Sequence, residues 1–491
     1  MSNINKCFKL VYDTIIIKYK EPLENLERQI FMHLQEADIR TRPSHSNGIW
    51  CPLLLPAILI TYTCFDNVSL LYKFISLSSI GLLCYCMLFL IFLSTSSEVL
   101  KTTSFSGCIA SGLVASVTIH IFLQQGLQLS IAFPLLSTML FAWMLRLSIM
   151  ECHNTFTIGE AMIMAQSVVL FSTMCIVKFF FELHSADEET EFIGVLVYTV
   201  LSTVGLIVIA LCILSDSQRN LKALAYIIGS AVIFVLLMLH SILGSNCLIT
   251  IFSYIFLENN RAEIFTFWLI LLVIAVCVLC IRTKLAVKAS TVTRKTFHVL
   301  ASLVFMSGII FDINLMILAA GIGLGVLIFV EALRKSGIEP ISSALQSAFL
   351  VYSDEKDCGL FAMTPLYLYI GLAFPLLVVP NRADRELELL SGVLSIGVGD
   401  TAASWFGSKY GFNKWSGSNR TLEGTAFNIL SQVGTVYALQ LFGLLNAKYA
   451  LLRTIFAATV SGLVEAKTDQ VDNLVLPLVT MLAFQFTRIL Y

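Results

Sequence analysis

The sequence predicts an all-α fold, a polytopic transmembrane helical bundle of about 15 spans. Hydrophobic residues make up 57% of its 491 residues and charged residues only 13%, and the mean hydropathy is +0.85. Soluble globular domains carry about 25% charged residues, so this composition indicates a chain that crosses a membrane many times. The formal net charge of -1 indicates no nucleic-acid partner, and any recognition of charge must be local.

Apolar runs that are long enough to cross a membrane define the predicted spans. A helix rises about 1.5 Å per residue and the hydrocarbon core is about 30 Å thick, so a span needs about 20 apolar residues. Several runs are short or broken by Gly and Pro, and these are also compatible with re-entrant segments. The runs lie near residues 49–65, 70–93, 108–123, 129–149, 160–181, 192–214, 223–243, 264–281, 297–311, 313–330, 362–380, 389–407, 425–445, 449–464 and 474–490.

The chain divides into three predicted regions. Residues 1–48 form a cytosolic N-terminal tail, because they mix charges of both signs and lack the apolar core of a secretory signal peptide. An amphipathic helix near residues 23–34 and a disordered tail both fit this stretch. Residues 49–290 form a hydrophobic multi-span region with no catalytic constellation. Residues 291–491 form a C-terminal membrane domain that carries the candidate chemistry.

Basic residues beside the spans predict the orientation, because cytoplasmic loops are enriched in Lys and Arg. Residues 282–295 hold five basic residues and no acid, which places them in the cytosol. Residues 181–191 hold five acidic residues and neither Lys nor Arg, which suits the opposite side. Alternating spans then place residues 408–423 and 465–473 on the cytosolic face, provided that residues 341–352 lie along the membrane.

Arg294, Lys295 and His298 lie at the predicted cytosolic entrance of a span. Positions 294 and 298 share a helical face, so a guanidinium and an imidazole can project together toward an anion. Basic residues are also expected at a cytosolic helix end from orientation alone. Both interpretations stay open.

Asp400 lies in the segment GVGDTAAS, near the cytosolic end of another span. Ser404 follows one helical turn later, and Gly397 and Gly399 allow a backbone or a ligand to approach closely. A carboxylate at membrane depth needs either a basic partner or a divalent metal that bridges phosphates. The small polar residues around Asp400 favour a functional site over a structural ion pair.

The loop of residues 408–423 combines three basic residues with glycines and hydroxyl groups. Backbone N–H groups, hydroxyls and cations together suit phosphate oxygens, and Thr421 before a new helix would add a helix N-terminus. The loop has neither the GxxxxGK[ST] nor the GxGxxG pattern. A loop made basic by its orientation is the alternative. Residues 419–421 also spell a glycosylation sequon, which the predicted orientation leaves unmodified.

Glu465, Asp469 and Asp472 are spaced i, i+4, i+7, which predicts one shared helical face. Like charges stacked in this way repel one another unless a cation offsets them. A bound divalent metal and pairing with the basic loop both satisfy this requirement. A solvated helix end is the alternative.

Four segments resemble pieces of the polyprenol kinase family: RKTFH at 294–298, GVGDTAASWFGSKYG at 397–411, NRTLEGT at 419–425 and EAKTDQVDNLVLP at 465–477. The resemblance covers residues 291–491, and the preceding region matches only as a hydrophobic array. Arg420 departs from the family pattern, in which lysine is frequent, and this changes the donor geometry.

The resemblance implies an endoplasmic reticulum multi-pass enzyme with its active site facing the cytosol. Such an enzyme moves the γ-phosphoryl group of CTP onto the terminal hydroxyl of dolichol, and the dolichyl phosphate serves glycan assembly. The residues that align with the family's CTP-binding segment are Ser408, Lys409, Tyr410, Gly411, Phe412, Asn413, Lys414, Trp415, Ser416, Gly417, Ser418, Asn419, Arg420, Thr421, Leu422 and Glu423.

Phosphoryl transfer depends mainly on positioning and charge neutralisation, and the candidate residues are assigned on that basis. The basic loop residues hold the triphosphate, and Asp400 coordinates a divalent cation, Mg²⁺ or Ca²⁺, or orients the dolichol hydroxyl. Glu465 and Asp472 bind the metal or anchor the loop. The predicted catalytic residues are Asp400, Arg294, Lys295 and His298, and the predicted metal ligands are Asp400, Glu465 and Asp472.

Two other functions remain compatible with the sequence. The first is a lipid cytidylyltransferase, which uses CTP, releases pyrophosphate and makes a CDP-lipid. The second is a membrane transporter, since many spans with intramembrane acids also describe a carrier. A carrier is expected to show broken helices in matching halves, and the sequence shows no such pairing.

Overall fold

The computed structural model describes residues 22–101, 106–124, 126, 128–181, 188–257, 261–284, 291–352, 359–380, 385–416, 418 and 420–489. Within these residues the protein is helical, and β-type pairing is limited to an isolated bridge between Lys414 and Thr421. The predicted all-α fold class is therefore confirmed.

Long apolar runs form the helices, since a helix pairs its backbone N–H and C=O groups within one segment and so tolerates apolar surroundings. Each predicted span coincides with helical residues, and residues 22–36 form the predicted N-terminal helix. The elements are η1 (Cys51–Leu53), α2 (Leu54–Phe65), α3 (Leu70–Thr95), α4 (Glu98–Lys101), α5 (Ser106–Leu123), η2 (Gln128–Ala132), α6 (Phe133–Met150), α7 (Ile158–Phe181), α8 (Glu188–Ile213), η3 (Asp216–Gln218), α9 (Leu221–Leu243), α10 (Cys247–Phe256), α11 (Ala262–Lys284), α12 (Thr291–Phe311), α13 (Ile313–Lys335), α14 (Ile341–Tyr352), α15 (Met363–Val378), α16 (Glu386–Leu389), η4 (Val393–Asp400), α17 (Thr401–Tyr410), α18 (Leu422–Leu441), α19 (Ala450–Lys467) and α20 (Asp472–Ile489).

Among the described residues, seven helices are long and apolar enough to cross a membrane. The predicted count of about 15 spans is not confirmed, because the other predicted spans coincide with shorter or less apolar helices. Helices α18, α19 and α20 belong to the less apolar group, since polar side chains lie on their inner faces. One of the seven is Leu129–Met150, which runs from η2 through α6. The other six are α3, α7, α8, α9, α12 and α13.

The chain forms two compact units whose segments alternate along the sequence. The smaller comprises Met1–Pro56, Phe74–Thr173 and Cys358–Leu360, and the larger comprises Ala57–Lys73, Met174–Asp357 and Phe361–Tyr491. All candidate site residues lie in the larger unit. The division into three regions at residues 48 and 290 stays a prediction.

In the smaller unit, a buried ion pair ties the N-terminal segment to α7. The Arg42 guanidinium lies 2.7 Å from the Glu160 carboxylate, and the two side chains are 4% and 0% exposed. Glu160 also accepts from the Thr157 N–H at 3.0 Å at the start of the helix. Glu160 is therefore a satisfied helix-end group.

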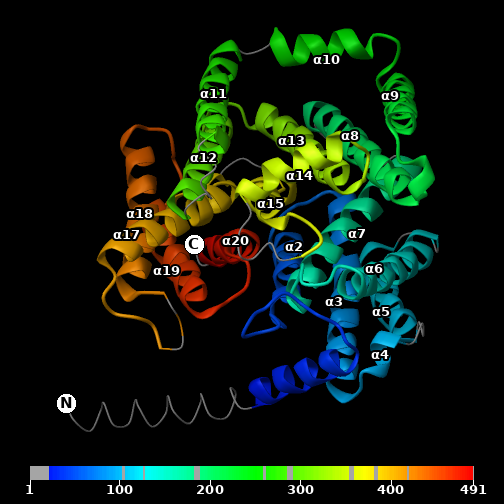
Figure 1. Ribbon diagram of the computed structural model, residues 1–491, viewed down its shortest axis with the longest axis horizontal. Helices are drawn as coiled ribbons and strands as arrows, with labels where there is room; N and C mark the ends of the chain where they lie inside the picture. The colour runs from blue at the N-terminus through cyan, green and yellow to red at the C-terminus, as the bar shows by residue number, and fades with distance from the viewer. Residues whose placement is uncertain are drawn as a thin grey trace. The chain divides into compact units, whose positions relative to one another are not determined.

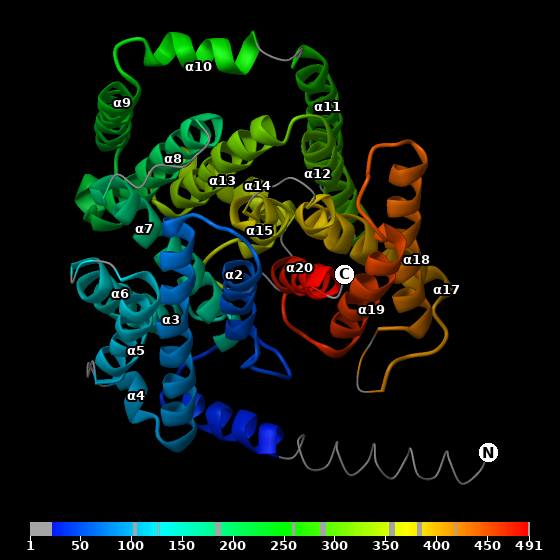
Figure 2. The same ribbon diagram turned by 180° about the vertical axis from the view of Figure 1, so that it is seen from behind.

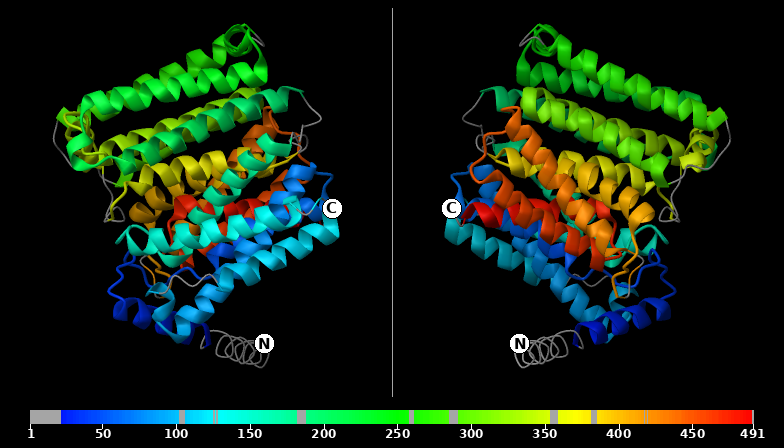
Figure 3. Two further views of the ribbon diagram at one scale, coloured as in Figure 1. Left: turned by 90° about the vertical axis from the view of Figure 1, so that its right-hand side faces the viewer. Right: turned by 90° about the vertical axis from the view of Figure 1, so that its left-hand side faces the viewer.

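In the larger unit, η4 lies among several helices that come from distant parts of the sequence. It contacts α12, α18, α19 and α20, and α17 continues from it along α18 (Figure 1). From behind, α18 and α19 lie side by side, and α20 packs against α19 (Figure 2). Seen from the side, these helices run roughly alongside one another (Figure 3). Residues at the ends of different helices therefore meet.

Two glycines let η4 approach its neighbours without a side chain between them. A Cβ at Gly397 would lie 1.9 Å from the Ser302 Oγ atom of α12, and a Cβ at Gly399 would lie 2.5 Å from the Asn428 Oδ1 atom of α18. Both distances are too short for a normal contact, so these positions require glycine. Asp400, the next residue, is consequently held between α12 and α18.

Candidate active site

Asp400 ends the π-helical segment η4, a rare conformation that is frequent at functional sites. The residue is buried, with 3% of its surface exposed. The Lys295 ammonium of α12, 105 residues earlier, donates to Oδ2, and the Ser404 hydroxyl donates to Oδ1 at 3.4 Å. A buried carboxylate needs a cationic partner, and Lys295 provides it. The structure thus joins two of the predicted catalytic residues.

His298 lies one turn beyond Lys295 on α12 and is buried. Its Nδ1–H donates to the carbonyl oxygen of Arg294 at 3.1 Å, since a carbonyl oxygen only accepts. The side chain of Asn473 is a second polar neighbour of the ring. Arg294 and His298 are therefore linked through the Arg294 backbone. The joint projection of their two side chains toward an anion stays a prediction.

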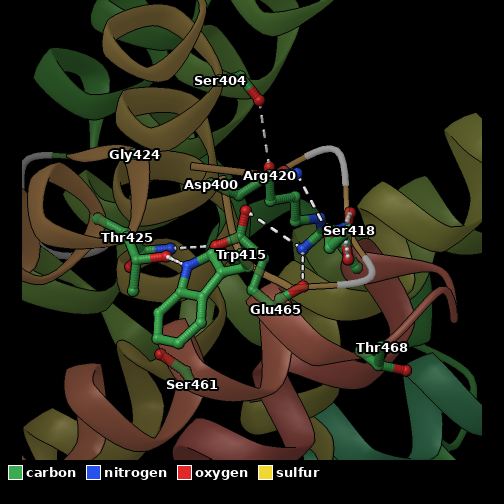
Figure 4. A network of polar contacts seen from close by, with 12 residues as sticks. Asp400, Ser404, Trp415, Ser418, Arg420, Gly424, Thr425, Ser461, Glu465 and Thr468 are labelled. Atoms are coloured by element: carbon green, nitrogen blue, oxygen red, sulfur yellow. Dashed lines mark hydrogen bonds and ion pairs between the residues drawn. The ribbon is translucent and has the colours of Figure 1, made fainter. Parts of the chain in front are cut away.

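Arg420 connects the loop before α18 with α19 and α20. Its Nη2 donates to both carboxylate oxygens of Asp472, at 2.9 and 2.8 Å, and its Nη1 donates to the carbonyl oxygen of Glu465. Figure 4 shows the guanidinium directed at Glu465. Burial disfavours the charge, but Asp472 and Glu465 outweigh it and raise the pKa of Arg420, so the side chain stays cationic.

Glu465, near the end of α19, is a buried carboxylate. Its Oε1 lies 3.4 Å from Nη1 of Arg420, and its Oε2 accepts from Asn428 Nδ2 of α18. Burial and the charge of Asp400 raise the pKa of Glu465 above its ordinary value. We call the following five residues the carboxylate cluster: Asp400, Glu465, Asp472, Lys295 and Arg420.

The carboxylate cluster holds three acidic and two basic groups, so it favours an additional cation. Its acidic groups supply oxygen ligands, which Mg²⁺ and Ca²⁺ prefer. Among the residues that the structure describes, no three His, Cys, Asp or Glu side chains are arranged to hold a metal by themselves. The cluster therefore suits a cation that takes further ligands from a phosphate, as Mg²⁺ usually does.

The predicted single helical face for Glu465, Asp469 and Asp472 is wrong. Helix α19 ends at Lys467, and the backbone is extended at Thr468, with φ -114° and ψ 145°. Asp469 is exposed in the turn, and α20 begins at Asp472. Glu465 and Asp472 still meet, because the turn places the end of one helix beside the start of the next.

The predicted CTP-binding loop is closed by hydrogen bonds of its own. The Trp415 N–H donates to the Arg420 carbonyl oxygen at 2.9 Å, and the Leu422 N–H donates to the Asn413 carbonyl oxygen at 2.8 Å. The Glu423 carboxylate accepts from Asn413 Nδ2 at 2.7 Å. Backbone hydrogen bonds, first that of its own N–H, lower the pKa of Glu423. The loop is therefore a defined hairpin.

Trp415 fastens this hairpin to the neighbouring helices. Its Nε1–H donates to Thr425 Oγ1 of α18 at 3.0 Å, and Lys467 Nζ of α19 lies 5.1 Å from the ring centroid. That distance is within the range of about 6 Å for a cation–π contact. Thr421 caps α18 by accepting a first-turn N–H at 3.1 Å. These contacts place Arg420 against the acidic residues of the carboxylate cluster.

The three cations of the loop are not gathered at one point. Arg420 joins the carboxylate cluster, whereas the side chains of Lys409 and Lys414 are exposed. Gly417 and Asn419 lie outside the described residues. The two lysines are therefore accessible from water. The sequence alone did not show that they lie apart from Arg420.

Sequence reasoning missed two amides, Asn428 and Gln432, which are completely buried in α18. Gln432 Nε2 donates to Asn428 Oδ1 at 2.5 Å and lies 3.5 Å from Ser461 Oγ of α19. Two amides one turn apart in an apolar helix are a recognisable signal, because buried polar groups need partners.

Apolar helices whose ends bury an ion-paired carboxylate cluster beside a hydroxyl-rich loop define a membrane-embedded enzyme. A family model described as Dolichol kinase matches residues 73–366, more than half of the chain. The chain belongs to the dolichol kinase family.

The individual proteins to which the chain is similar are also named as dolichol kinases. The chain is 30% identical to a dolichol kinase of Bos taurus over 394 residues, which cover 76% of this chain and 72% of the relative. It is 29% identical to a dolichol kinase of Homo sapiens with the same coverage. The match to dolichol kinase EVAN of Arabidopsis thaliana is 30% identical over 235 residues and covers 47% of this chain and 41% of the relative. No solved structure matches the chain.

The similarity reaches further toward the N-terminus than the sequence motifs indicate. The family model begins at residue 73, includes Arg294 through His298 and ends before Asp400. The expectation that the region before residue 290 matches only as a hydrophobic array is therefore wrong. The assignment of Asp400 and of the loop rests on their motifs and their geometry.

Proposed function

We propose that the protein is a CTP-dependent lipid kinase, which transfers the γ-phosphoryl group of CTP to dolichol and yields dolichyl phosphate. Membership of the dolichol kinase family supports the lipid and the reaction. The resemblance of residues 408–423 to the family's CTP-binding segment supports the nucleotide. The observation that carries the proposal is the meeting of the Lys295–Asp400 and Arg420–Asp472 pairs at the ends of apolar helices.

In this reaction the dolichol hydroxyl oxygen attacks the γ-phosphorus of CTP, the bond from that phosphorus to the β,γ-bridging oxygen breaks, and CDP leaves. Asp400, whose orientation is set by Lys295 and Ser404, orients the hydroxyl and takes its proton. Arg294 and His298 lie near the transferred group, one turn apart on α12.

The triphosphate lies between the hairpin and the carboxylate cluster. Lys409 and Lys414 reach its oxygens from the water side, and Arg420 from the cluster. A divalent cation, Mg²⁺ or Ca²⁺, held by Asp400, Glu465 or Asp472 together with phosphate oxygens, would supply charge neutralisation.

The dolichol chain enters sideways between the helices, with its hydroxyl at the membrane–water boundary. The proposed site faces the cytosol from the endoplasmic reticulum membrane, where soluble CTP reaches it. The excess of basic residues in the segment 282–295 supports this orientation. The product, dolichyl phosphate, would serve protein glycosylation.

Incubation of the purified protein with γ-labelled CTP and dolichol tests the proposal. Label in the lipid and release of CDP are expected. Release of pyrophosphate with formation of a CDP-lipid would identify a cytidylyltransferase instead, and absence of any transfer would overturn both functions. Asp400→Ala should lower turnover by on the order of a hundredfold or more, and retention of more than about a tenth of wild-type turnover would remove Asp400 from the chemistry.

A further inference from the structure

A row of buried amides in α18 ends on the Glu465 carboxylate. Gln432 Nε2 donates to Asn428 Oδ1 at 2.5 Å, and Asn428 Nδ2 donates to Glu465 Oε2. Both amide residues are 0% exposed. Polar groups buried this deeply are costly unless they are hydrogen-bonded, and here one of the partners is a residue of the proposed site.

The observed hydrogen bonds define the orientation of this row. Asn428 directs its NH₂ group, which can only donate, toward Glu465 Oε2. Its carbonyl oxygen then needs a donor, and Gln432 provides one. The position of the Glu465 carboxylate is therefore set from inside the protein.

Glu465 is held from two sides by groups of different kinds. Arg420 approaches Oε1 from the loop, and its side chain is 28% exposed. Asn428 holds Oε2 from the fully buried side. A triphosphate competes for a guanidinium, because phosphate oxygens are strong partners for arginine, but it does not compete for a buried neutral amide. The Asn428 bond therefore persists when Arg420 engages a phosphate.

The same amides form the surface on which the backbone before Asp400 rests. A Cβ at Gly399 would lie 2.5 Å from Asn428 Oδ1 and 2.6 Å from Gln432 Nε2. One pair of amides thus contacts both Glu465 and the residue that precedes Asp400. This contact fixes the position of the two acids relative to each other.

We infer that Asn428 is a positioning residue for phosphoryl transfer, which keeps Glu465 in place relative to Asp400 while Arg420 binds the triphosphate. Gln432 supports it by fixing the orientation of its amide. The inference rests on the proposed function, because that function assigns Glu465 to the site.

A double-mutant cycle between Asn428→Ala and Glu465→Ala, assayed with γ-labelled CTP and dolichol, tests the inference, because each substitution removes the hydrogen bond between the two side chains. Asn428→Ala should lower kcat by roughly tenfold to a hundredfold, the usual effect of removing the partner of a site residue, and should change the KM for CTP little. In the Glu465→Ala background it should cause no further loss. Losses that multiply would show that Asn428 acts independently of Glu465 and would overturn the inference.

Gln432→Met is a second variant for the case in which Asn428→Ala does not fold. It keeps the length of the side chain and removes the donor to Asn428. It should lower kcat less than Asn428→Ala, and this loss should also vanish in the Glu465→Ala background. Thr435→Ala, in the same helix, removes a hydroxyl that donates to the Ser431 carbonyl oxygen and should leave kcat unchanged. If the wild type transfers no label, the proposed function fails. If the wild type transfers label and both amide variants keep its kcat, the positioning role fails alone.

Discussion

Arg420 and Asp472, 52 residues apart, form a two-point ion pair in which Nη2 of the guanidinium lies 2.9 and 2.8 Å from the two carboxylate oxygens. The pair fastens the hairpin before α18 to the first turn of α20. A lysine at this position would retain the charge but not the planar fork.

Arg420→Lys should therefore lower kcat/KM for CTP by about tenfold, because an ammonium lacks the rigid planar fork whose two nitrogens contact Asp472 and Glu465. Arg420→Ala should cost more and should also lower the melting temperature, since it leaves two carboxylates without their cation. Steady-state kinetics and thermal unfolding measure the two effects. Lys448→Ala removes an exposed cation away from the site and should change neither. Equal kinetics for Arg420→Lys and wild type would contradict the role of the fork.

Lys295→Met should lower thermal stability, because Asp400 is buried and loses its cationic partner. Adding Asp400→Asn removes the uncompensated charge and should recover most of the lost melting temperature. Lipid phosphorylation should stay absent in the double variant, since the carboxylate is needed for the chemistry. Thermal unfolding and the label-transfer assay, performed on the same samples, separate the two roles. A double variant no more stable than Lys295→Met would refute the pairing.

Gly399→Ala should lower both stability and activity, because its Cβ would lie 2.5 Å from Asn428 Oδ1. Gly434→Ala is the matched control in α18, where a Cβ would meet no atom within 4 Å. This control should be neutral or should stabilise the protein by up to about 1 kcal/mol, the difference in helix propensity. Unfolding in denaturant and turnover measure both variants. Similar behaviour of the two would show that η4 does not need its close contact with α18.

Asp66 joins two arginines from distant segments of the larger unit. Its Oδ1 lies 2.7 Å from Arg385 Nη2 and 3.2 Å from Arg488 Nη2. Asp66→Asn should lower the melting temperature by several degrees, because the Arg385 side chain is only 3% exposed. The KM for CTP should not change. Asp216→Asn, which removes a surface pair with Arg219, should leave stability within error. Equal effects of the two variants would contradict a structural role for Asp66.

The predicted orientation leads to a glycosylation test. Asn419 should carry no glycan, because the sequon at residues 419–421 is predicted to face the cytosol. Leu183→Asn creates the sequon Asn-His-Ser in the acidic segment predicted on the opposite side, and this variant should gain a glycan. A mobility shift that glycosidase removes is the measurement. A glycan on Asn419 of the wild type would reverse the orientation and exclude cytosolic CTP as the donor at this site.

Composition and the length of apolar runs determined the membrane class and the location of the helices. The physical reason is local: a segment without water must satisfy its backbone internally, and a helix does so within its own residues. The candidates Asp400, Lys295 and Arg420 were also visible, because charges are rare and costly in such surroundings. The span count was not, since the polar inner faces of α18, α19 and α20 reduce the hydropathy on which counting depends.

Tertiary structure alone decided which charges pair and where α19 stops. The Lys295–Asp400 pair joins residues 105 apart, and spacing within one segment carries no information about the helix that packs against it. The i, i+4, i+7 pattern of the acidic residues suggested one helical face, but the chain turns after Lys467, and only the turn brings Glu465 near Asp472. The supporting role of Asn428 could not be predicted either, because it depends on the hydrogen bond to Glu465, which lies on the neighbouring helix α19.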